Sequence, residues 1–141
     1  MKYTILEGIA TADVAYKIYG KNLSELFKNA ALAVEQTMVD LATLAPLQNL
    51  EFRVKNLELE DLLLDFLNHL IFLKDARQLV FSKFDLHLKK EDYFQLEGMM
   101  KGEKIDIRRH NLRTDVKAVT YHNLQIKKER GFYTAIIVLD I

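Results

Sequence analysis

Two aspartates interrupt apolar segments near opposite ends of the chain. Asp13 lies within the strand-like segment 11–19, and Asp140 follows the apolar segment 132–139. Burying a carboxylate in a short apolar strand costs free energy unless something compensates its charge. Hard divalent cations prefer carboxylate oxygens, and the free α-carboxyl of Ile141 would supply more of them. We therefore expect a calcium or magnesium site if the two ends meet. Taken alone, each acid is also typical of a solvated strand edge or terminus.

Three further residues have types and positions suited to binding a partner. Lys117 lies in the predicted strand 114–127 and would present its ammonium to a partner or a phosphate, or simply to solvent. Asp75 follows the predicted helix 59–74, where an acid opposes the helix dipole and is expected to serve another purpose. His110 lies in the basic loop formed by residues 108–113, and loops often carry functional residues. This loop could meet an acidic partner or an RNA phosphate, or remain solvated.

The composition predicts a single cytoplasmic domain. The chain has 141 residues, half of them apolar, which suffices for a core. Basic and acidic residues number 20 each, so the net charge is zero, which argues against a domain that grips nucleic acid by itself. The absence of cysteine excludes disulfides and thiolate metal sites. The longest apolar run is too interrupted to span a bilayer, and the N-terminus lacks a signal-peptide pattern.

Hydrophobic periodicity predicts two helices among six strands. The first helix covers 23–38, with Asn22 as its N-cap and Glu25 as the capping-box partner. The second covers 59–74 and is apolar around much of its circumference, which predicts burial on more than one side. The predicted strands are 11–19, 49–55, 80–88 (with an imperfect phase near Phe81), 93–100, 114–127 and 132–139.

Two connections in this pattern are also predicted. Residues 101–103 are expected to form a loop, and Glu129-Arg130-Gly131 a short hairpin turn in which the glycine takes a positive φ. The order of elements favours an α+β fold: a mostly antiparallel sheet with two helices packed on it, in one domain spanning 1–141.

Several segments in combination resemble the archease family over essentially the whole chain. They are Thr11-Ala12-Asp13-Val14, the helix-initiating segment 19–33, the acidic leucine-rich segment 59–68, the segment 116–124 (VKAVTYHNL) and the ending Val138-Leu139-Asp140-Ile141. The family usually has a histidine three residues before the motif aspartate, where this chain has Ala10.

The resemblance implies a non-enzymatic cofactor of the RtcB-type RNA ligase, which joins a 3′-phosphate or 2′,3′-cyclic phosphate end to a 5′-hydroxyl end in tRNA splicing. Such cofactors promote guanylylation and turnover of the ligase and can broaden its nucleotide use. By this resemblance, Asp13, Asp140 and the terminal carboxylate of Ile141 hold a divalent metal, calcium or else magnesium, and Lys117 is a further functional residue. RNA is then met only through the ligase, in tRNA splicing or in RNA repair.

Two other functions remain compatible with the same residues. A small metal-dependent hydrolase of phosphate esters would use the same carboxylates, but it also needs a general base beside the metal. A chaperone-like protein that protects RNA-modifying enzymes would need an exposed apolar patch.

Overall fold

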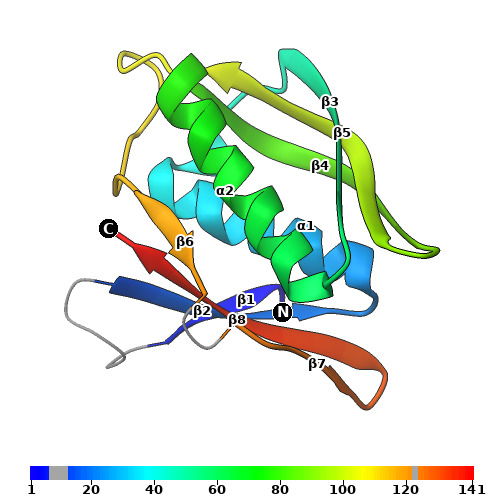
Figure 1. The fold of residues 1–141 in the computed structure, drawn as a ribbon. Helices are drawn as coiled ribbons and strands as arrows, with labels where there is room; N and C mark the ends of the chain where they lie inside the picture. Colours follow the sequence, from blue (N-terminus) through cyan, green and yellow to red (C-terminus); the bar gives the residue numbers. More distant parts are fainter. Residues whose placement is uncertain (7–12, 122–123) are drawn as a thin grey trace.

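The computed structural model describes residues 1–6, 13–121 and 124–141. Figure 1 shows the arrangement of the helices and strands. The helical elements are α1 (Leu23–Met38), η1 (Leu41–Thr43) and α2 (Leu59–Arg77). The strands are β1 (Tyr3–Leu6), β2 (Asp13–Gly20), β3 (Gln48–Asn56), β4 (Leu79–Lys90), β5 (Phe94–Lys104), β6 (Ala118–Thr120), β7 (Ile126–Glu129) and β8 (Phe132–Asp140). The predicted α+β class with two long helices is confirmed.

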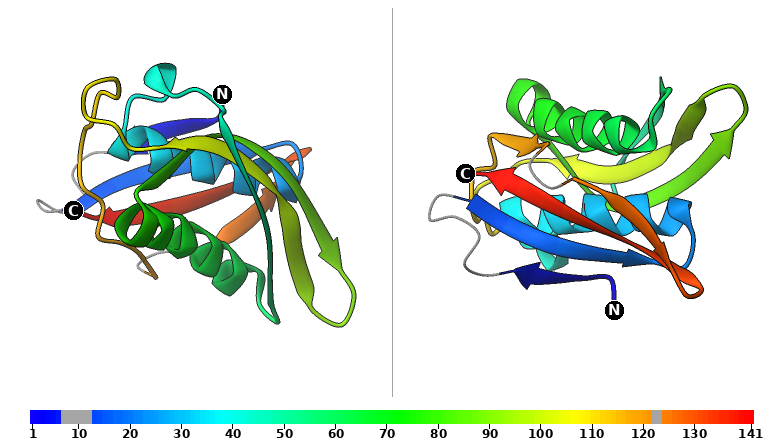
Figure 2. Two further views of the ribbon diagram at one scale, coloured as in Figure 1. Left: turned by 90° about the horizontal axis from the view of Figure 1, so that it is seen from above. Right: turned by 60° about the horizontal axis from the view of Figure 1, so that its bottom comes forward.

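The described strands pair antiparallel throughout, and they form two sheets where a single sheet was expected. The first sheet has the order β1-β2-β8-β6, with β7 also paired to β8. The second has the order β3-β5-β4. The helices lie between the sheets (Figures 1 and 2): α1 packs against β2 and β8 on one side and β4 on the other, and α2 packs against the second sheet and β6. None of the helices in the described ranges is long and apolar enough to cross a membrane.

Aromatic side chains at the centre of the core join the helices to the second sheet. Phe66 of α2 stacks on Phe52 of β3, with 5.3 Å between ring centroids, and on Phe27 of α1 at 6.4 Å. Its ring also meets the edge of Phe84 from β4 at 6.4 Å. The sequence predicted that α2 is buried on more than one side, because it is apolar around much of its circumference. The structure confirms this prediction.

Two features set by local sequence are also confirmed. The Asn22 side chain accepts a hydrogen bond from the Glu25 N–H at 2.9 Å and so caps α1. The Glu25 carboxylate returns a bond to the N–H of Lys21, one residue before the position that a standard capping box uses. Arg130 and Gly131 connect β7 to β8, and Gly131 has the predicted positive φ, at 74°.

The second helix is longer than predicted, which moves Asp75. α2 continues to Arg77 and ends at Gln78, which has a left-handed φ of 56° and donates its N–H to the Lys74 carbonyl. Asp75 therefore lies in the last turn of α2 and not beyond it. Sequence periodicity misplaced the end because the left-handed cap is a glutamine, whereas glycine is the usual signal.

The predicted loop at 101–103 is wrong, because β5 runs through it to Lys104. Gly102 lies so close to β4 that an added Cβ would collide with the Val80 carbonyl oxygen. Its glycine reflects a close backbone approach and not a turn. The register of β4 against β5 shifts between Phe81 and Lys83. This bulge explains the imperfect alternation that the sequence shows near Phe81.

The predicted strand 114–127 is also wrong over much of its length. Within the described residues of that segment, only Ala118–Thr120 and Ile126 onward are strands. Lys117 therefore precedes β6 and does not lie within a strand. Side chains of α2 also bind this segment: Asn68 binds Val119, and Glu60 accepts the N–H of Ile126 at 3.2 Å, while both residues pair with β8 as well.

Glu35 of α1 is a fully buried acid between α1 and β4. Its Oε2 accepts the Phe81 N–H at 3.0 Å, beside the bulge, and its Oε1 has no hydrogen-bond partner among the described residues. Burial raises the pKa of Glu35 to about 8, against the opposing effects of the Phe81 hydrogen bond and the charge of Lys74. The carboxyl is thus neutral in the folded protein at neutral pH.

Glu35 should make folding less favourable as pH rises from about 4.5 to about 8. In this window the folded state keeps a proton that the unfolded chain has released, so the free energy of unfolding should fall by up to about 1.4 kcal/mol per pH unit. Glu35→Gln cannot ionise and should remove most of this dependence. Urea unfolding between pH 5 and 9 measures it. The exposed control Glu91→Gln should behave like the wild type, and a wild-type stability that does not fall across the window would contradict the assignment.

Candidate functional site

The two acids that the sequence singled out lie opposite each other. β2 and β8 pair antiparallel in a register that places Asp13 directly across from Asp140. Side chains at opposed positions share one face of a sheet, with Cβ atoms about 4.5–5.5 Å apart. The two ends of the chain therefore meet, as the metal-site hypothesis requires. Ala10, where the family usually has histidine, lies outside the described residues.

Strand alternation fixes which way these acids point. Val14 and Leu139, the next opposed pair along the strands, belong to the core between the sheets. Because successive side chains alternate, Asp13 and Asp140 lie on the outer face of the first sheet. Both are partly exposed. The side chain of Ile141 packs against the core, which holds this residue just after the end of β8.

The backbone of Lys117 is hydrogen-bonded to this site. Its N–H donates to the Asp140 carbonyl at 2.8 Å, and the next residue, Ala118, pairs directly with Asp140. The Lys117 side chain is exposed. Asp13, Asp140 and Lys117 therefore lie on three adjacent segments at one end of the first sheet. Figure 1 shows this end, where β6 and the C-terminus lie side by side.

The side chains of α2 fix β6 on the edge that β8 leaves open. Asn68 donates to the Val119 carbonyl at 3.1 Å and accepts the Val119 N–H at 2.9 Å, as a neighbouring strand would. Lys74, only 9% exposed, donates to Asp115 Oδ1 at 2.5 Å and to the Val116 carbonyl at 3.1 Å. Neither Asn68 nor Lys74 was predicted from the sequence to act in this way. The sequence does hold a signal for them, because the Asn68 amide and the Lys74 ammonium are polar groups within a helix that is otherwise apolar on nearly every side.

Asp75 is not part of the Asp13–Asp140 pair. Its Oδ1 lies 3.1 Å from the Lys74 Nζ, so Asp75 and Asp115 share that ammonium. Burial by itself would lower the pKa of Lys74, but the hydrogen bonds and charges of Asp115 and Asp75 outweigh burial and raise it. Asp75 thereby helps to keep Lys74 charged, and its own side chain remains 59% exposed.

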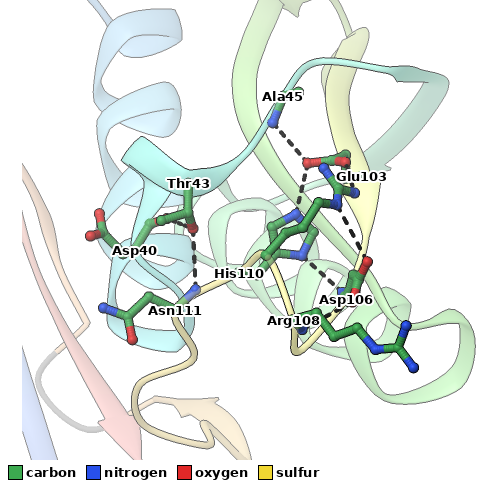
Figure 3. Close-up of polar contacts among 9 residues, drawn as sticks. Asp40, Thr43, Ala45, Glu103, Asp106, Arg108, His110 and Asn111 are labelled. Carbon is green, nitrogen blue, oxygen red and sulfur yellow. Dashed lines mark hydrogen bonds and ion pairs between the residues drawn. The ribbon is translucent and has the colours of Figure 1, made fainter.

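His110 is buried inside the basic loop that follows β5 (Figure 3). Its Nδ1 accepts the Asp106 N–H at 2.9 Å, so the other nitrogen carries the proton and donates to Glu103 Oε2 at 2.7 Å. Glu103 also accepts the Ala45 N–H and pairs with Arg109. The Ala45, Arg109 and His110 hydrogen bonds lower the pKa of Glu103 to about 2. Both ring nitrogens are thus engaged in holding the loop, which leaves neither for a partner.

The site offers only oxygen ligands from its two aspartates. No three His, Cys, Asp or Glu side chains cluster as a metal site anywhere in the ranges that the structure describes. A cation between Asp13 and Asp140 would need further oxygen ligands, for example from water.

Comparison with known proteins places the chain among archeases. Residues 3–141 match the Archease protein family (MTH1598/TM1083). The protein archease of Sulfurisphaera tokodaii is 37% identical over 131 residues, which cover 93% of this chain and 94% of the relative. That of Methanosarcina mazei is 34% identical over 142 residues, which cover 99% and 96%.

Solved structures share the fold. The solution structure of Methanobacterium thermoautotrophicum protein 1598 has a TM-score of 0.86 at 34% identity, over 99% of this chain and 98% of that chain. The crystal structure of a Thermotoga maritima archease, described as a possible chaperone, has a TM-score of 0.65 at 22% identity, over 98% of both chains. The second likeness concerns the fold alone.

Replacing Asn68 should weaken the support of β6. Asn68→Ala leaves the Val119 N–H and carbonyl without their helix partner, which should lower the free energy of unfolding by about 1–3 kcal/mol despite the higher helix propensity of alanine. Urea unfolding measures the loss. Hydrogen exchange should also accelerate at the Val119 amide. Asn49→Ala, at an exposed position of β3, is the matched control. Equal stability of the two variants would show that α2 does not hold β6 through Asn68.

Proposed function

Because the chain belongs to the archease family, we propose that it is a protein cofactor, and not itself an enzyme, that activates an RtcB-type RNA ligase. It promotes guanylylation and multiple turnover of that ligase in tRNA splicing or RNA repair, and it broadens the ligase's choice of nucleotide. The observation that carries the proposal is the register that sets Asp13 against Asp140 beside Lys117. That arrangement brings together the residues through which the family resemblance implies activation.

In this proposal Asp13, Asp140 and the terminal carboxylate of Ile141 hold a divalent metal, calcium or magnesium. The donors fit, because carboxylate oxygens without nitrogen or sulfur ligands suit these hard cations. The metal supplies positive charge at the outer face of the sheet. The two aspartates are held by strand pairing, so the site needs little rearrangement to receive it.

Lys117 supplies the second charge in this proposal. Its backbone is fixed to β8 and its ammonium is free to extend from the exposed side, where it can pair with a phosphate oxygen of the ligase's nucleotide. A chain with zero net charge has no strong hold on RNA by itself, which supports an action through the ligase. Asp75 serves as a partner contact in this proposal, whereas His110 acts indirectly by ordering its loop.

Multiple-turnover ligation by the RtcB-type ligase of the same organism tests the role. The wild type should stimulate turnover strongly, and Asp13→Asn, Asp140→Asn and Lys117→Ala should each lose most of that stimulation, because each removes a charge at the site. Asp85→Asn and Lys101→Ala, two exposed positions on the second sheet, are the matched controls and should stimulate normally. An active ligase that the wild type fails to stimulate at any ratio would refute the proposal.

Metal binding can be measured without the ligase. Calcium should raise the melting temperature of the wild type, because a ligand that binds only the folded state stabilises it by about 2.7 kcal/mol at 100 times its Kd. Asp13→Asn should abolish this shift and, without metal, melt slightly higher than the wild type, because the opposed charges are gone. Asp85→Asn should retain the shift. Extending the chain by one residue after Ile141 removes the terminal carboxylate from this position, so the calcium shift should become smaller if that carboxylate is a ligand. An equal calcium shift in wild type and Asp13→Asn would argue against this site.

A chaperone-like role is a second candidate, suggested by the description of the Thermotoga maritima archease as a possible chaperone. The exposed large apolar residues that it would use include Leu57, Phe72, Ile107 and Tyr121. They lie on separate segments of the chain, and scattered exposed apolar residues are ordinary on protein surfaces. Suppression of the aggregation of an unrelated client protein would favour this role over ligase activation.

A further inference from the structure

A cavity of about 620 Å³ lies between the C-terminal end of α2 and the segment that links β5 to β6. Part of its lining is apolar core, contributed by the buried side chains of Met38 and Val80. Two further apolar residues of the lining project to the surface, Ile107 at 78% and Leu112 at 45% exposure. A large isoleucine that is nearly fully exposed beside an apolar cavity is suited to contact with another protein.

The charged part of the lining is negative on balance, because three acids, Asp75, Asp106 and Asp115, face two cations, Lys74 and Arg113. Asp75 and Asp115 share the single ammonium of Lys74, and their side chains are 59% and 77% exposed. Arg113, the second cation of the lining, is directed to Asp40 at 3.7 Å. Only one oxygen of Asp75 and one of Asp115 faces Lys74. The exposed carboxylates are therefore complementary to a cation brought by a partner.

The cavity adjoins the Asp13–Asp140 site. Asp115 lines the cavity, and Lys117, two residues further on, donates its N–H to the Asp140 carbonyl. In Figure 1 the segment between β5 and β6, the end of α2 and the C-terminus all lie on the same side of the molecule. A single protein bound at this side could reach both the cavity and the outer face of the first sheet.

We propose that this cavity docks a segment of the ligase that carries an arginine or lysine next to an apolar side chain. The cation meets Asp75 and Asp115, and the apolar side chain covers Ile107 and Leu112. Such a pairing of a charged contact with an apolar anchor is typical of the residues that dominate interface energetics. A small amine could satisfy the carboxylates but would leave Ile107 uncovered, which favours a protein segment. This inference rests on the proposed function, because it takes the ligase as the partner.

Binding of the ligase and stimulation of ligation, measured for the same variants, test the docking site. Ile107→Lys removes the apolar contact and repels a basic segment, so it should raise the Kd for the ligase at least about tenfold, equivalent to about 1.4 kcal/mol. Asp75→Asn should raise it about threefold and reduce the salt dependence of binding. Stimulation by both variants should recover at saturating concentration. The matched control Leu57→Lys places a lysine at a position of 73% exposure beyond the other end of α2 and should bind like the wild type.

Each alternative outcome overturns the docking site in a recognisable way. If Ile107→Lys and Asp75→Asn bind the ligase with the wild-type Kd, the cavity is not a docking site although ligase activation stands. If the variants change sedimentation of the protein alone and not the Kd, the occupant is a second copy of this chain. If the wild type neither binds nor stimulates the ligase, the proposed function fails together with this inference. Asp13→Asn should bind normally and fail to stimulate, which separates docking from activation.

Discussion

The pairing of β2 with β8 is the contact on which the rest of the structure depends. It joins strands from opposite ends of the chain through eight opposed residue pairs, from Asp13 with Asp140 to Gly20 with Tyr133. Closing so long a loop costs only modestly more entropy than closing a shorter one, and the strands offset it by burying Ile18 and Ile137 against α1. β1, β6 and β7 all attach to this pair. The same strand pairing therefore buries part of the core and positions the candidate site.

The helix α2 completes the sheet end that β2 and β8 begin. β6 is only three residues long, and a strand that short has few ladder bonds to hold it. Asn68 supplies two further bonds on its open edge, and Lys74 fixes the residues just before it. Because Lys117 lies between these anchors, its position is determined by a helix that is distant in sequence. The buried Lys74 keeps its charge through Asp115 and Asp75, so the exposed acids also contribute to this support.

What the sequence predicted follows from local rules, and what it missed follows from contacts between distant segments. The cap of α1 at Asn22 and the hairpin at Gly131 each depend on neighbouring residues. By contrast, Gly102 resembled a turn glycine because nothing local reveals that Val80 lies against it. The strand 114–127 was overpredicted for a related reason, since apolar alternation cannot reveal that the Lys74 side chain of α2 holds the backbone just before β6. Periodicity indicated where the acids lie along their strands, but only the register could place Asp13 opposite Asp140.

The opposition of the two aspartates is imposed by the core and not by a ligand. The neighbouring pair Val14 and Leu139 is apolar and faces the helices, and a slip of one residue in β2 would move Asp13 into the core while exposing Val14. The core therefore fixes the register of β2 against β8, because any other register would cost a large free energy, and the two aspartates lie opposite each other as a result. Two carboxylates held by strand pairing in this way would need little rearrangement to receive the cation proposed for this site. Binding of that proposed cation would require no ordering of the strands, so no binding free energy would be lost to ordering them.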